Sequence, residues 1–98
     1  MATIFTKIQR KINQGLFDFG EHCIEELADE KISFTDAVGV VLSPSNYHEF
    51  TDDESHSRYA FEGYANDGRM ICVIVFISQG KVWFKTAYEI FESFEQRL

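Results

Sequence analysis

Two groups of side chains in this sequence are candidates for chemistry, a histidine near carboxylates and a set of basic and hydroxyl side chains in strand-like segments. His22 opens a segment with helical spacing, and Glu25 and Glu26 follow about one turn later, where a carboxylate can orient an imidazole. The second group lies in segments with strand character, and its members are Arg58, Lys85, Thr86 and Tyr88. A sheet face that presents Arg, Lys, Thr or Tyr can bind phosphate and stabilise its transition state. Each group also has a plain structural interpretation, as a histidine that starts a helix and as an ordinary half-buried sheet.

Other reactive side chains do not form a recognisable site. Metal ligands would have to come from His22, Cys23, His48, His56 and Cys72, but their positions show none of the spacings typical of metal sites. Both cysteines lie in apolar stretches, which predicts buried, reduced thiols rather than nucleophiles. The carboxylates of residues 52–54 lack the glycine and the ligand spacing of a calcium loop and indicate a solvated turn. We therefore expect neither a metal nor a cofactor.

The charge distribution limits the possible partners. The net charge of −7 and the pI of about 4.8 argue against a dedicated nucleic-acid binder, which needs clustered Lys and Arg. The first 15 residues are an exception, because they carry Lys7, Arg10 and Lys11 and no acid. These three residues are the candidate nucleic-acid contacts.

Length and hydropathy predict one cytoplasmic domain. The chain has 98 residues, and 45% of them are hydrophobic, enough for a single core spanning residues 1–98. The longest apolar run, residues 70–77, is far shorter than the roughly 20 residues of a membrane span. The N-terminal sequence MATIFTKIQRK has no signal-peptide core.

Helical spacing is confined to the N-terminal half and the C-terminal end. Residues 3–14 form an amphipathic pattern that Gly15 ends, and a second helix follows with its glutamates and aspartates predicted to point outward. Ser33 and Asp36 form a capping signal for a third helix, although β-branched residues leave a strand over residues 38–42 as an alternative. A short C-terminal helix is expected over residues 89–98.

Period-two patterns predict four strands, at residues 46–50, 58–64, 70–77 and 81–88. Turn sequences connect the last three, so the expected sheet is an antiparallel meander with residues 70–77 at its centre. A regular last strand would place Thr86 and Tyr88 on the face of Val82 and Phe84, and Lys85 on the opposite face. The exposed edge strand and the terminal helix could support a homodimer.

These segments carry a family resemblance. The run His22-Cys23-Ile24-Glu25-Glu26-Leu27 is followed by Ile32-Ser33 and Asp36, then Arg58-Tyr59 with Gly63 and Gly68, and finally Thr86-Ala87-Tyr88. This resembles a bacterial domain-of-unknown-function family with a helical His-Ala-x-x-Arg-Met, then Gly-Ile-Ser, and a last strand ending in Thr-x-Tyr. The likeness covers roughly residues 4–90. More distantly, the segment ISFTDAVGVVLSP and the following strands are similar to toxins of the BrnT and MqsR kind.

The resemblance implies a RelE-like α+β fold, in which two to three N-terminal helices pack on a curved four-stranded antiparallel sheet. It also implies a type II toxin that cleaves messenger RNA, free or on the ribosome, without a metal, and that an antitoxin silences. Carried onto matching positions, His22 is the general acid or base and Arg58 the phosphate clamp. Tyr88 is the proton donor, supported by Thr86, and Lys85 is a second electrostatic group.

Three positions depart from the family pattern. Glu26 and Glu30 stand where the pattern has arginine, and Lys31 stands where it has glycine. Carboxylates beside His22 would repel RNA. Either the active face lies towards the basic residues of the first 15 positions, or this chain has lost nuclease activity. The second function is then a non-catalytic acidic protein of the same fold, which binds a basic partner as an immunity protein, inhibitor or regulator does.

Overall fold

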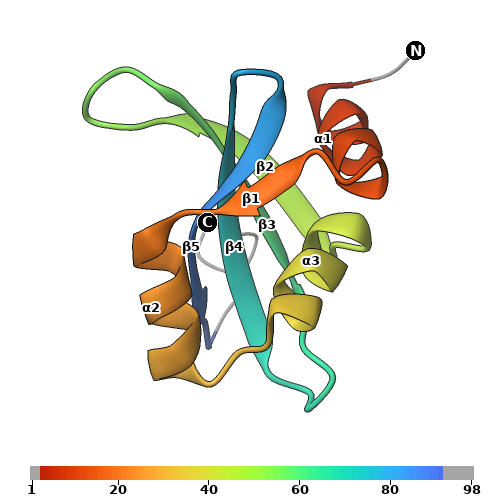
Figure 1. Cartoon of the computed structure of the whole chain (residues 1–98). Coiled ribbons are helices and arrows are strands. Elements are labelled where there is room, and N and C mark those ends of the chain that lie inside the picture. Colours follow the sequence, from red (N-terminus) through yellow and green to blue (C-terminus); the bar gives the residue numbers. More distant parts are fainter. Residues whose placement is uncertain (1–2, 92–98) are drawn as a thin grey trace.

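The computed structural model describes residues 3–91, in which three helices cover one side of a five-stranded sheet (Figure 1). In chain order the elements are α1 (Ile4–Asn13), β1 (Phe17–Phe19), α2 (Glu21–Glu30), α3 (Phe34–Leu42), β2 (Asn46–Thr51), β3 (Ser57–Tyr64), β4 (Met70–Ser78) and β5 (Lys81–Glu89). The predicted α+β class is confirmed. No helix in the described part of the chain is both long and apolar enough to span a membrane.

The sheet is mixed rather than purely antiparallel. Its strand order is β1-β5-β4-β3-β2, and β2 to β5 pair in sequence order, each antiparallel to the next. The fifth strand, β1, pairs with β5 in parallel, with Phe17 opposite Val82 and Phe19 opposite Phe84. Three residues are too few to show a strand period in the sequence. The apolar strand β4 lies at the centre, as its sequence predicts.

One hydrophobic core joins the helices to the sheet. The helices contribute Ile8, Ile12, Cys23, Leu27, Ala37, Val40 and Val41, and the facing sheet residues include Phe61, Ile71, Val73, Val75, Val82, Phe84 and Ala87. Helix α3 approaches β3 closely, because a Cβ on Gly63 would lie 3.4 Å from Cγ1 of Val40. The opposite face of the sheet carries three more buried residues, Ala60, Glu62 and Cys72, which lie outside this core cluster.

Capping residues and glycines lie at several of the helix and turn boundaries, where the sequence predicts them. The Ser33 hydroxyl accepts a hydrogen bond from the Asp36 N–H at 3.0 Å, and α3 is a helix, so the alternative strand is wrong. Gly15 ends the first helical segment with a positive φ of 79°. At the C-terminal end, Glu89 belongs to β5, and residues 92–98 of the expected terminal helix lie outside the described residues.

The C-terminal end of α2 is held by a non-local cap. Lys31 adopts the left-handed conformation, with φ 57° and ψ 45°. Arg69, from the turn between β3 and β4, donates hydrogen bonds of 2.7 Å to the carbonyls of Glu30 and Lys31. Its Nε also donates to Asp67, and that contact raises the pKa of Arg69. Arg69 therefore satisfies helix carbonyls that would otherwise lack partners.

The left-handed backbone at Lys31 gives a stability prediction. We expect Lys31→Gly to raise the free energy of unfolding by about 0.5–1 kcal/mol, because the conformation costs about 1–2 kcal/mol in residues with a Cβ, and glycine's extra chain entropy offsets only part of this. Ala28→Gly, inside the same helix, is the matched control and should lower it by about 0.5–1 kcal/mol. Urea unfolding followed by circular dichroism measures both. A less stable Lys31→Gly protein would contradict the argument.

Candidate active site

Helix α2 runs along the edge of β5 beyond the point where β1 ends. The Gly20 N–H donates to the Phe84 carbonyl at 2.9 Å, which starts the helix against β5. At the other end of the helix, a Glu30 carboxylate oxygen accepts the Glu89 N–H at 3.1 Å. A Cβ on Gly20 would lie only 3.3 Å from the Phe84 oxygen, so glycine permits this approach. One flank of α2 thereby reaches the side chains of β5.

A histidine, a carboxylate and a hydroxyl meet at this flank. Nε2 of His22 lies 2.6 Å from Oε1 of Glu26, and the Thr86 hydroxyl donates to the same carboxylate oxygen. The His22 side chain is 73% exposed, whereas that of Glu26 is 26% exposed. A neutral imidazole that donates its Nε2–H to Glu26 keeps Nδ1 as a proton acceptor. The cluster therefore presents an oriented, solvent-accessible base.

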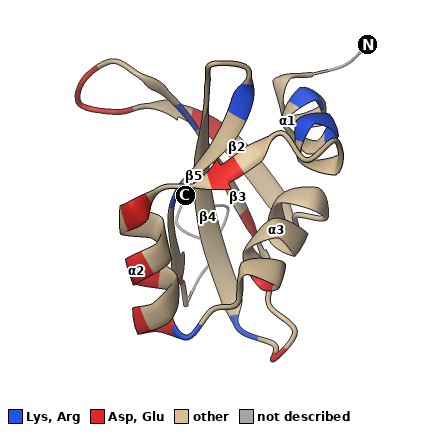
Figure 2. Cartoon of the chain, viewed as in Figure 1, with Lys and Arg blue, Asp and Glu red and all other residues tan. Residues whose placement is uncertain are grey.

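The expected outward direction is wrong for two of the acids on α2. Glu26 and Glu30 are half-buried and accept hydrogen bonds from Thr86 and from the Glu89 backbone. Glu21, Glu25 and Asp29 remain exposed. Figure 2 shows acidic residues along the length of α2. Both carboxylates thus take part in the contact between α2 and β5.

A β-bulge in β5 changes which face its last residues occupy. Thr86 pairs with Ile74 and Phe84 pairs with Val75, so Lys85 has no partner on β4. Val82, Phe84 and Ala87 face the core, which places Thr86 and Tyr88 on the opposite face, with Trp83. The expected sharing of a face by Thr86, Tyr88 and Val82 is wrong, because the extra residue shifts the alternation. Lys85 is exposed, and it sits directly beside Thr86.

Arg58 lies elsewhere on the sheet and already has a carboxylate partner. Its Nη2 is 2.9 Å from Oδ2 of Asp52, and its guanidinium carbon is 4.7 Å from the centre of the Phe76 ring. Backbone N–H groups of His56 and Glu54, together with Arg58, hold the pKa of Asp52 below its usual value. Two strand spacings of about 4.8 Å separate the β3 backbone from β5, roughly 10 Å in all. Arg58 is therefore not part of the His22 cluster.

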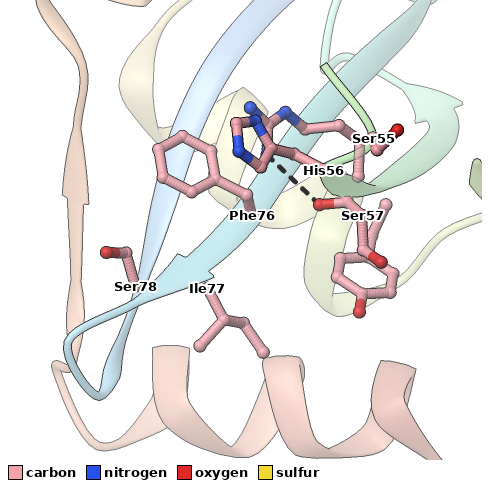
Figure 3. A pocket seen from close by; sticks show the side chains of 8 residues that line it. Ser55, His56, Ser57, Phe76, Ile77 and Ser78 are labelled. Atoms are coloured by element: carbon pink, nitrogen blue, oxygen red, sulfur yellow. Dashed lines mark hydrogen bonds between the residues drawn. The ribbon is translucent and has the colours of Figure 1, made fainter. Parts of the chain in front are cut away.

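Arg58 instead lines a pocket where the β2–β3 hairpin and the β4–β5 hairpin no longer pair with each other. Pairing of β3 with β4 extends to Tyr59 and Val75, beyond which Arg58 pairs only with β2 and Ile77 only with β5. The pocket in this gap has a volume of about 420 Å³ (Figure 3). It is lined by residues 55–59 and 76–78.

Among the basic residues of α1, Lys11 contacts the turn between β4 and β5. Lys11 donates to the Gly80 carbonyl at 2.9 Å, while Lys7 and Arg10 are exposed. Figure 2 shows this basic helix and the acidic α2 at different ends of the molecule. A ligand would have to extend along the sheet to contact both α1 and the His22 cluster.

Cys23 and Cys72 are both buried, and neither forms a disulfide. Burial, and secondarily the negative charge of Glu26, raise the pKa of Cys23 to about 11, so this thiol stays protonated at neutral pH. Cys23 cannot act as the nucleophile of the neighbouring cluster. Within residues 3–91, no three His, Cys, Asp or Glu side chains gather as a metal-binding group.

Fold and site together define a class of small α+β protein in which an acidic helix and the last strand of a mixed sheet hold a histidine, carboxylate and hydroxyl cluster. Residues 19–89 match the family described as domain of unknown function DUF4258, and the chain belongs to this family. The matched region contains His22, Glu26, Lys85, Thr86 and Tyr88. No curated protein matches the chain significantly.

Proposed function

We propose that this protein is a metal-independent endoribonuclease of the RelE-like toxin class, with its active site at the contact between α2 and β5. The observation that carries the proposal is the chain of contacts from His22 through Glu26 to Thr86, beside the bulged Lys85. RNA cleavage without a metal needs a base, a cation and a proton donor near one phosphate. The contact region between α2 and β5 offers a candidate for each, with His22 on α2 and Lys85 and Tyr88 on β5.

In the proposed reaction His22 is the base. Its Nδ1 accepts the proton of the ribose 2′-hydroxyl, and the 2′-oxygen attacks the phosphorus. The bond from phosphorus to the 5′-oxygen breaks and leaves a 2′,3′-cyclic phosphate. The Lys85 ammonium stabilises the negative charge of the phosphorane, and the Tyr88 hydroxyl protonates the leaving 5′-oxygen. Glu26 and Thr86 hold the imidazole in place, and proton exchange with water restores both groups.

In this proposal Glu26 and Glu30, which stand at the two arginine positions of the family pattern, have structural roles in the site. Glu26 orients the base and Glu30 binds the β5 backbone, so neither carboxylate points freely at the substrate. Arg58 already pairs with Asp52. In this proposal Lys85, rather than Arg58, contacts the reacting phosphate. An antitoxin or another protein partner would silence the enzyme by covering the cluster.

Adjacent glutamates on α2 provide a matched test. We expect regulated expression of the wild type in a bacterium to arrest growth with loss of messenger RNA, and His22→Ala, Glu26→Gln and Tyr88→Phe to abolish both effects. Glu25→Gln removes an exposed carboxylate one residue away and should leave arrest unchanged. The purified protein should cleave RNA in the presence of EDTA. Unimpaired growth and intact RNA with a folded wild-type protein would refute the proposal.

A second function, the non-catalytic acidic binding protein, is favoured by a different surface. An apolar pocket of about 270 Å³ between β1 and the start of α3 is lined by Phe17, Phe19, Phe34, Thr35 and Val38. Phe34 is 50% exposed, and the exposed acids of α2 belong to the same helical side of the molecule. An apolar pocket near carboxylates fits a segment that carries both basic and apolar residues.

The identity of the neighbouring gene discriminates between the two functions. A neighbouring antitoxin gene would favour the nuclease, and a neighbouring gene for a large secreted toxin would favour the immunity protein. The product of that gene, co-expressed with this chain, should bind through the pocket in the second case. Phe34→Ser should then weaken the complex, whereas Phe91→Ser, another exposed aromatic residue, should not. Equal binding by both variants would remove the pocket from consideration.

A further inference from the structure

Two pairs of a cation and an aromatic ring lie next to each other on the sheet face opposite the helices. The Arg58 guanidinium carbon is 4.7 Å from the centre of Phe76, and the Lys81 ammonium is 4.7 Å from the centre of Trp83. Phe76 and Trp83 are opposite each other in the pairing of β4 with β5. Cross-strand partners point to the same side of a sheet, and we call these two side chains the aromatic surface.

This aromatic surface shares its face with the proposed active site. The bulge at Lys85 places Thr86 and Tyr88 on the same side of β5 as Trp83. At about 3.3 Å per residue, Trp83 lies roughly 10 Å along the strand from Thr86. The buried residues of all three helices pack on the other face, so within residues 3–91 no helix covers the aromatic pair.

The two cations differ in how firmly they are held. Arg58 is 12% exposed and bonds Asp52 at 2.9 Å and the Ser57 carbonyl, which fixes its guanidinium over Phe76. Lys81 is 36% exposed, and its carboxylate contact, to Asp18 at 3.5 Å, is looser and itself 56% exposed. An incoming phosphate can therefore compete with Asp18 for Lys81, while Arg58 stays with Asp52.

We propose that Phe76, Trp83 and Lys81 form a subsite for one nucleotide of single-stranded RNA, next to the phosphate that is cleaved. The base stacks on Trp83, next to Phe76 with its fixed Arg58, and its phosphate contacts Lys81. This combination binds single strands with little sequence preference. This inference rests on the proposed function and adds the path of the substrate, which runs along β5 from Lys81 to the His22 cluster.

Trp83 is the only tryptophan in the chain, so its fluorescence reports on this subsite directly. The probe is a short 2′-O-methyl oligouridine, which cannot be cleaved, titrated into His22→Ala protein. We expect saturable quenching that weakens with added salt. Lys81→Gln and Phe76→Leu should each weaken binding at least fivefold, and Asp18→Asn should tighten it by freeing Lys81. Thermal unfolding confirms that each variant is folded.

The outcomes distinguish this subsite from its alternatives. Weaker binding in Lys7→Gln and unchanged binding in Lys81→Gln would place RNA on α1 and overturn the inference. Uridine monophosphate that binds as tightly as the oligomer would make this a free-nucleotide site and overturn the path. Quenching by a basic protein partner but not by the oligomer would also overturn it. Cleavage by the wild type without quenching would refute the subsite alone, and quenching without cleavage would refute the nuclease alone.

Discussion

Phe84→Ala is expected to lower the free energy of unfolding by about 3–5 kcal/mol. The Phe84 ring is fully buried, stacks on Phe19 at a centroid distance of 4.4 Å and meets the edge of Phe17 at 5.9 Å. Removing the ring leaves a cavity where β1 and the start of α2 contact β5. Because small domains are stable by only about 5–15 kcal/mol, the loss should be a large share of the total.

Phe84→Leu is the control, since it keeps most of the apolar volume and should cost less than about 1.5 kcal/mol. Urea unfolding followed by circular dichroism compares the two variants. A similar cost for both would mean that the ring contacts with β1, rather than the buried apolar volume that leucine keeps, hold this part of the core. The alanine variant should also lose function, because β1 leads directly into the helix that carries His22.

Lys85→Ala is expected to reduce kcat/KM for RNA cleavage by about 10²–10³-fold, the usual loss when one electrostatic contact to a transition state is removed. Stability should change little, because the Lys85 side chain is exposed and the bulge is a property of the backbone. Lys85→Arg keeps the charge and should retain most activity. Cleavage of a labelled oligoribonucleotide measures all three proteins.

Lys7→Ala, an exposed lysine on α1, is the control for general loss of positive charge and should have a small, salt-dependent effect on KM. A large loss in this variant with full activity in Lys85→Ala would move the phosphate contact to α1. Equal modest losses in both would indicate non-specific attraction of RNA, with no cation at the reacting phosphate.

The helices, the four long strands and the central place of β4 follow from patterns that lie within single segments. The Ser33 cap and the glycines at the turns act over a few residues, so their effect is readable from the sequence. The strand β1 and the bulge at Lys85 are different, because both depend on pairing between distant segments. The three residues of β1 carry too little local pattern to specify the pairing with β5, and a single bulged residue leaves no local pattern at all.

The members of the candidate site can be named from the sequence, but their grouping depends on the fold. The contact between His22 and Glu26 follows from helical spacing, and the sequence already predicts it. The bond from Thr86 to Glu26 could not be predicted, since it depends on α2 lying along β5. The pairing of Arg58 with Asp52, which separates Arg58 from His22, depends on how the loop after β2 folds back.

The parallel pairing of β1 with β5 sets an order of events during synthesis. Residue 17 pairs with residue 82, so the first strand made has no partner until the last strand leaves the ribosome. The site is divided in the same way, because His22 and Glu26 come from the early part of the chain and Thr86 from the late part. A nascent chain that stops before β5 therefore carries His22 and Glu26 without the strand whose Thr86 bonds Glu26.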